Sequence, residues 1–181
     1  GWSPDQVSRI DAGVFSQVDP EVIAAISPQQ AAMLSSDQLS NIRPLGAAGL
    51  QAATVLAMDA GQLSGLRPAA VGSLNPLDIC VPVGEACVLG ENGLTAQQMA
   101  GFRPEAFAHL QSAQFEVIRP EQVTDLSTDA INQIRARGAA ALQPDTVAAL
   151  SNRQLTALRP AAVGALDPAA IALLSPDQVA S

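Results

Sequence analysis

The residue types that most often carry chemistry are sparse in this chain of 181 residues. It holds two cysteines, Cys80 and Cys87, one histidine, His109, and nine basic side chains, all of them arginine. These residue types could form a disulfide, a metal site or a basic surface that binds an anion, and each of these needs structural elements that position its side chains.

The two cysteines lie on either side of Pro82-Val83-Gly84-Glu85, which has the Pro and Gly placement of a type II turn. A hairpin about this turn would place Cys80 opposite Cys87, at a reach that a disulfide can span. The alternative is two buried thiols that behave as small apolar side chains. Zinc is excluded, because one distant histidine and two cysteines do not complete a tetrahedral set.

Six arginines recur at equivalent places in the chain, each at the start of an eight-residue unit that is described below. They are Arg43, Arg67, Arg103, Arg119, Arg135 and Arg159. One interpretation is a row of guanidinium groups along one edge, which would bind an acidic protein, a carboxylated glycan or a second copy of the chain. The other is structural: arginine can donate to the last carbonyls of a helix and pair with nearby Asp and Glu.

The remaining candidate groups favour structure over catalysis. His109 has no Cys, Asp or Glu at ligand spacing, so we expect it at the surface or at an edge. Eight carboxylates fall in expected first helical turns, where the helix dipole favours negative charge. The sequence shows no glycine-rich phosphate loop, nucleophile elbow or metal-ligand spacing, and it predicts no enzymatic activity, cofactor or metal.

Proline spacing reveals the elements. Twelve of the thirteen prolines keep one phase of eight residues within two stretches, 3–79 and 95–181. The chain divides into units such as SPDQVSRI, RPAAVGSL and DPAAIALL. Position 1 is often Ser, Thr, Asp or Asn and position 2 is often Pro, which suit a helix N-cap and first turn. Position 5 is apolar in every unit, and position 8 is Leu, Ile, Val, Met or Phe in every complete one.

Glutamine at position 4 completes a capping box, in which its side chain reaches back to the N–H of the cap. Nine units carry it: Gln6, Gln30, Gln38, Gln62, Gln98, Gln114, Gln122, Gln154 and Gln178. Each unit is thus expected to be one short helix, because proline at every eighth residue interrupts a long one. Helices this short are unstable alone. The pattern predicts an all-α fold, an α-solenoid or superhelix of stacked octapeptide helices.

A second repetition lies above the octapeptide. Residues 35–79 align without gaps on residues 127–171, at an offset of 92, which indicates a tandem duplication. We expect a first array at 3–79, an inserted Cys-bearing loop or short hairpin at 80–94, and a second array at 95–181, packed as one continuous unit.

Composition narrows the function classes. The apolar fraction is 48% and the net charge is −8. With a pI near 4.4, binding to nucleic acid is disfavoured, because it needs a basic face. No stretch has the roughly 18 apolar residues of a membrane span. A disulfide would favour an extracytoplasmic place: secreted, periplasmic or cell-surface.

The units SPDQVSRI, RPAAVGAL and DPAAIALL resemble the helical repeats of the mesothelin, stereocilin and otoancorin group. That resemblance implies superhelical packing of short helices and, from the properties of the group, cell-surface adhesion. The chain departs from the group in lacking Lys and Tyr, and its Ala and Arg bias is typical of a bacterial protein.

These features predict a non-enzymatic extracellular or cell-surface repeat scaffold for adhesion, protein binding or spacing, as a segment of a longer protein. Its expected partners are a protein or glycan at the cell surface or matrix, and end-to-end self-association is a further candidate. The alternative is a carrier or enzyme with a small-molecule pocket in the superhelix groove or under the 80–94 loop.

Overall fold

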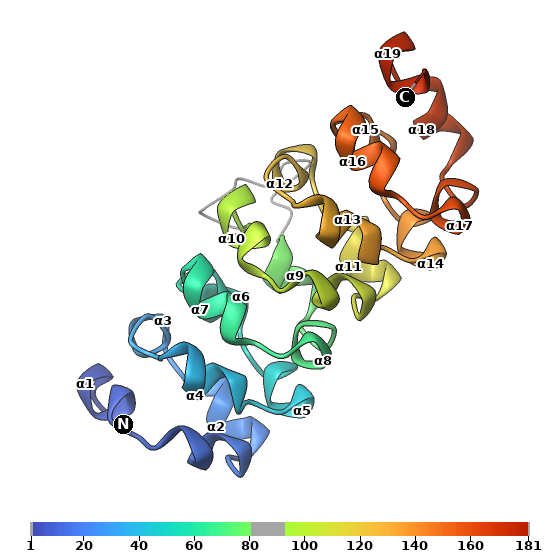
Figure 1. The fold of residues 1–181 in the computed structure, drawn as a ribbon. Helices are drawn as coiled ribbons and strands as arrows, with labels where there is room; N and C mark the ends of the chain where they lie inside the picture. The colour runs from blue at the N-terminus through green and yellow to red at the C-terminus, as the bar shows by residue number, and fades with distance from the viewer. Residues whose placement is uncertain (1, 81–92, 181) are drawn as a thin grey trace.

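The computed structural model describes residues 2–80 and 93–180, and within them the fold is all-helical (Figure 1). The first stretch contains α1 (Pro4–Ser8), η1 (Ala12–Ser16), α2 (Pro20–Ala24), α3 (Pro28–Ala31), α4 (Ser36–Ser40), α5 (Pro44–Ala47), α6 (Ala52–Leu56), α7 (Ala60–Gly65), α8 (Pro68–Val71) and α9 (Pro76–Ile79). The second contains α10 (Ala96–Gly101), η2 (Pro104–Ala108), α11 (Ser112–Glu116), α12 (Pro120–Val123), α13 (Thr128–Gln133), α14 (Ala136–Ala139), α15 (Pro144–Ala148), α16 (Asn152–Ala157), α17 (Pro160–Val163), α18 (Pro168–Ala172) and α19 (Pro176–Val179). The elements η1 and η2 are 3₁₀ helices.

Helices begin at intervals of eight residues because each unit carries its own start signal. Ser27 illustrates it: its hydroxyl accepts from the backbone N–H of Gln30, and Gln30 Oε1 accepts from the N–H of Ser27. Pro28 then occupies the first turn, where no N–H is needed. The capping boxes expected at position 4 are confirmed, since all nine glutamines accept from the N–H of their cap residue.

The packing follows one rule: every helix in contact with another lies against the third helix before or after it. Three columns result, which we call A, B and C. Column A holds α1, α3, α6, α9, α11, α14 and α17; column B holds η1, α4, α7, α10, α12, α15 and α18; column C holds α2, α5, α8, η2, α13, α16 and α19. Three successive units therefore make one turn, and the stack is elongated, with the termini at opposite ends (Figure 1).

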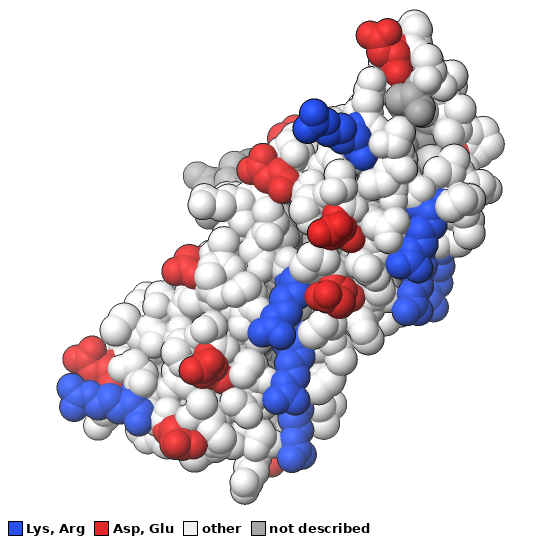
Figure 2. All heavy atoms as spheres, viewed as in Figure 1, with Lys and Arg blue, Asp and Glu red and all other residues white. Residues whose placement is uncertain are grey.

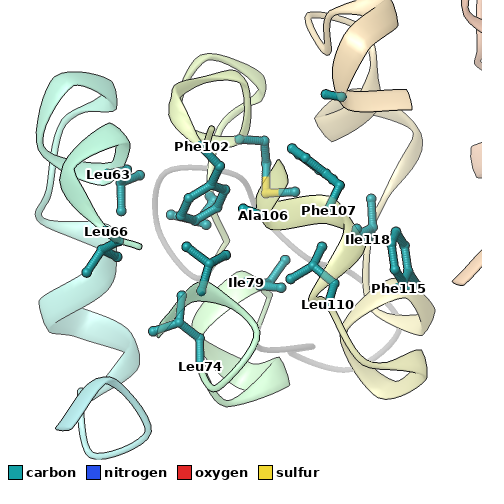
Figure 3. Packing of buried hydrophobic residues seen from close by; sticks show 14 of the residues in the cluster. Leu63, Leu66, Leu74, Ile79, Phe102, Ala106, Phe107, Leu110, Phe115 and Ile118 are labelled. Atoms are coloured by element: carbon teal, nitrogen blue, oxygen red, sulfur yellow. The ribbon is translucent and has the colours of Figure 1, made fainter. Parts of the chain in front are cut away.

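Apolar side chains at positions 5 and 8 fill the interior of the stack. Figure 3 shows Leu63, Ile79 and Phe107 from position 5 directed into the space that Leu66 and Leu110 from position 8 also occupy. Burying each such side chain contributes about 1.5–3 kcal/mol. The helices are too short to be stable alone, so this shared interior supplies their stability.

The two core positions face opposite directions along the stack. Position 5 loses its cover in the last turn, where Ile171 and Val179 are 42% and 66% exposed. Position 8 is only partly buried in the first turn, at Ile10 and Val18. Position 5 therefore packs on the turn that follows it, and position 8 packs on the turn before.

Residues 81–92, which lie outside the described residues, are inserted within one unit. An antiparallel bridge joins Cys80 to Gly93, and the N–H of Leu94 donates to Ile79 O at 2.9 Å. Leu94 thereby completes the unit that Asn75 begins. The columns continue across the insertion, because α10, η2 and α11 lie against α7, α8 and α9.

This arrangement explains the offset of 92 residues between the duplicated stretches. It equals ten units plus the 12 residues 81–92. Ten is not a multiple of three, so each duplicated helix occupies a different column from its original: α5 lies in column C and its duplicate α14 in column A.

Candidate functional site

The six arginines at position 1 do not share one edge, and the expectation of a single row was wrong in this respect. Arg43, Arg67 and Arg103 precede α5, α8 and η2, which are successive helices of column C. The other three lie elsewhere: Arg135 and Arg159 precede α14 and α17 of column A, and Arg119 precedes α12 of column B. Each duplicated helix lies in a different column from its original, so Arg135 and Arg159 are not in line with Arg43 and Arg67.

We call Arg43, Arg67 and Arg103 the column C arginine edge. All three are exposed. On the face drawn in Figure 2, basic side chains form a file over the region of α5 and α8, and a second basic group lies near α14 and α17. Leu45, directly after Pro44 on this edge, is 71% exposed. The edge thus offers three cations on successive turns beside an apolar side chain.

Some of the arginines have structural partners and some do not. Arg103 Nε donates to Ser64 O at 2.7 Å, and Arg159 Nη2 donates to Asn132 Oδ1 at 3.4 Å. Arg119 is half-buried, and its Nε has no hydrogen-bond partner. Arg43 and Arg67 make no side-chain hydrogen bond or ion pair with any described residue. Donation to a carbonyl near a helix end therefore accounts for Arg103, and Arg159 has a side-chain partner, but neither accounts for Arg43 and Arg67.

A role of the position 4 glutamines was missed by the sequence analysis. While Oε1 of Gln114 accepts from the cap N–H of Gln111, its Nε2 donates to Val71 O at 3.0 Å and Leu74 O at 2.9 Å. Those carbonyls end α8, one turn earlier in the stack. We call this pair of roles the glutamine clasp. Seven further glutamines also donate to carbonyls of the preceding turn: Gln30, Gln38, Gln62, Gln98, Gln122, Gln154 and Gln178.

Threonine, which has a shorter side chain, makes the equivalent bond to the preceding turn. Thr54 Oγ1 donates to Ile26 O and Thr146 Oγ1 donates to Ile118 O, each at 2.9 Å. Both threonines stand at position 4 and are buried. The recurrence of polar residues at a position next to the core was the sequence signal that could have revealed this clasp.

Asp78 is the one acid at position 4. Its side chain is 2% exposed, and its Oδ2 accepts from the cap N–H of Asn75 at 2.7 Å. Burial raises the pKa of this carboxyl from 3.8 to about 6, although the hydrogen bond from Asn75 acts in the opposite direction.

The other features considered in the sequence are the two cysteines, the histidine, a metal site and a membrane span. Cys80 is fully buried at the end of α9, whereas Cys87 lies outside the described residues, so their pairing stays a prediction. His109 is exposed at the end of η2. In residues 2–80 and 93–180, no group of three or more His, Cys, Asp or Glu could hold a metal ion. Nor does any helix of these ranges have the length and apolar character to cross a membrane.

Two hollows lie at the ends of the stack. One, of about 250 Å³, is lined by apolar side chains of the first turn, including Phe15, Val22 and Ile26, with Trp2 beside them. The other, of about 800 Å³ and more open, lies among Leu155, Val163 and other residues of the last turns. Both hollows lie where position 5 or position 8 side chains have no further turn against them.

No family model matches this chain, and no curated protein matches it.

Proposed function

We propose that this chain is a non-enzymatic α-solenoid scaffold that acts outside the cytoplasm and binds an acidic protein partner along its column C arginine edge. The solenoid assignment is supported by the packing rule, in which each helix stacks on the third helix along. Such stacking of quasi-equivalent units makes an extended surface, which repeat proteins use for binding.

The extracytoplasmic assignment rests on a disulfide between Cys80 and Cys87. Its support is the bridge of Cys80 to Gly93, which brings the two ends of the inserted segment together. The resemblance to the mesothelin, stereocilin and otoancorin group favours the same placement. Intact mass should rise by about two units on reduction, since each disulfide takes up two hydrogens, and an unchanged mass would contradict the pairing.

The observation that carries the binding proposal is the column C arginine edge. Three exposed cations on successive turns repel one another, and two of them have no partner in the described residues. Arginine recognises carboxylates through paired N–H donors, which makes a carboxylate-bearing chain the fitting ligand.

The spacing of the edge selects the form of the partner. Helices in contact lie about 10 Å apart, so successive arginines are spaced by about that distance along the stack. A peptide in the polyproline II conformation advances about 3.1 Å per residue with three residues per turn, so acidic residues at every third position lie on one face and match this spacing. The exposed Leu45 beside Arg43 favours a peptide, which can offer an apolar side chain, over a uniformly charged polysaccharide.

A binding titration with a fluorescent peptide that carries Glu at every third position tests this proposal. We expect saturable binding that weakens with added salt. Replacing Arg43 and Arg67 with Gln should weaken binding roughly twofold to thirtyfold, since each exposed pair contributes about 0.2–1 kcal/mol.

The duplication supplies a matched control. Arg135 and Arg159 are the duplicates of Arg43 and Arg67 but lie in column A. The R135Q/R159Q variant removes the same charge and should bind the peptide as the unmodified chain does. Equal loss in both variants, absent binding at low salt, or binding of an oligouronate in preference to the peptide would overturn the proposed partner.

A further inference from the structure

Asp78 stands at position 4 of its unit. Where position 4 is polar, the chain otherwise places Gln or Thr, whose side chains can donate a hydrogen bond; the remaining units carry Ala, Gly or Val there. Nine position 4 residues, seven Gln and two Thr, donate to carbonyls at or just after the end of a helix in the preceding turn, and Gln30 donates to Trp2 O ahead of α1. Where no insertion intervenes, the acceptor lies 28 residues earlier, as Ile26 O does for Thr54. The equivalent acceptor for Asp78 is Leu50 O, at the corner that leads into α6.

A carboxylate has no proton to donate, whereas a protonated carboxyl has one. We propose that Asp78 is a pH-operated clasp, which closes on the carbonyl of Leu50 when the carboxyl is protonated and opens when it ionises. In the closed form Asp78 would copy the glutamine clasp, with one oxygen on the cap N–H of Asn75 and the O–H on the turn below. The open form leaves a buried negative charge facing carbonyl oxygens.

The surroundings of Asp78 contain little that would compensate this charge. Column A places α9 between α6 and α11. Helix α6 has no titratable side chain, and α11 carries only Glu116, which is exposed and of the same sign. Cys80, buried directly after α9, supplies no positive charge, and no cation lies on either neighbouring helix.

The direction of the pH effect follows from the raised pKa. A group whose pKa is 3.8 in the unfolded chain and about 6 in the fold stabilises the fold fully below pH 3.8. This stabilisation is lost as the pH rises through about 6. The clasp is therefore closed in mildly acidic surroundings and open at neutral pH.

Unfolding by urea from pH 3.5 to pH 7.5 tests the proposal when the chain is compared with D78N. Asparagine has the shape of the protonated acid and a donor that does not titrate, so D78N should be the more stable protein at pH 7. The pKa of Asp78 rises from 3.8 to about 6 on folding. The unfolding constant of the unmodified chain, divided by that of D78N, should therefore increase roughly 100-fold from pH 3.5 to pH 7. Parallel pH profiles of the two proteins would overturn the proposal.

Two further measurements separate the clasp from a general effect of charge. The carboxyl ¹³C resonance that disappears in D78N should titrate near pH 6, and a midpoint near 4 would contradict the proposal. The T146D variant places an acid at an equivalent buried clasp in column B and should gain a similar dependence on pH. If T146D is equally stable at pH 4 and pH 7 relative to the unmodified chain, position 4 does not confer the switch.

Discussion

Glutamine at position 4 shows how one residue type can build both the local helix and the stack. Its oxygen caps the helix to which it belongs, and its NH₂ satisfies carbonyls at the end of a helix in the preceding turn. Of the two acceptors of Gln114, Leu74 O has no backbone donor among the described residues, because it lies beyond the last turn of α8, whereas Val71 O also accepts from the N–H of Leu74. The sequence predicted the cap, since it depends on residues three apart. The second bond reaches across about 30 to 43 residues and required the columns to be known.

Removing one clasp should be costly. Gln114 is 1% exposed, and Q114A would delete one cap acceptor, leave Leu74 O without its donor and leave Val71 O with only the N–H of Leu74. We expect a loss of about 2–4 kcal/mol in the free energy of unfolding, measured by urea titration.

Gln6 provides the control for this variant. It caps Ser3 in the same way but is exposed, and no turn precedes it in the structure. Q6A should lose about 1 kcal/mol or less. Equal losses in Q6A and Q114A would show that the cap alone matters.

At the scale of the element, each helix is held by very close approach to its column neighbours. The octapeptide pattern predicted where these helices begin. It did not predict which helix would be the neighbour, because every unit has similar core residues at positions 5 and 8. Gly72 and its duplicate Gly164, both in RPAAVG sequences, show the difference that the neighbour makes.

A methyl group at Gly72 would overlap His109 O of η2, whereas at Gly164 its nearest neighbour is Pro160 O at 3.5 Å. G72A should therefore destabilise the fold by about 1–3 kcal/mol, because two backbones must separate. G164A should be neutral or stabilising by up to about 1 kcal/mol, since alanine restricts the unfolded chain. Thermal unfolding followed by circular dichroism measures both, and matching effects in the two variants would contradict the assigned column contacts.

At the scale of the whole molecule, the number of units per turn, three, determines which side chains lie next to each other. The duplication alone suggested that Arg43 and Arg135 are equivalent, and in sequence they are. The two arginines are ten units apart. Because ten units are three full turns plus one unit, the two arginines project from different columns. A row of six arginines therefore becomes edges of three and two with Arg119 apart, and the arginine edge exists only in the folded stack.

Composition alone could not predict that three units make one turn of the stack. The number of units in a turn depends on the angle at each corner between helices, which no single unit encodes. The inserted residues 81–92 leave the count unchanged, because Leu94 completes the unit begun at Asn75.

Spin-label broadening tests the three-unit turn most directly. Four exposed residues occupy position 3 of their units and suit labelling. They are Asp129 in α13, Asp145 in α15, Arg153 in α16 and Ala161 in α17. Labels at 129 and 153, which are 24 residues apart, should lie about 10 Å apart in neighbouring turns of column C and broaden each other strongly. Labels at 129 and 145, only 16 residues apart, and at 129 and 161 should show weaker broadening, with single-label variants as the background. Broadening that is strongest at 16 residues, or that declines steadily with sequence separation, would contradict the packing of each helix on the third one along.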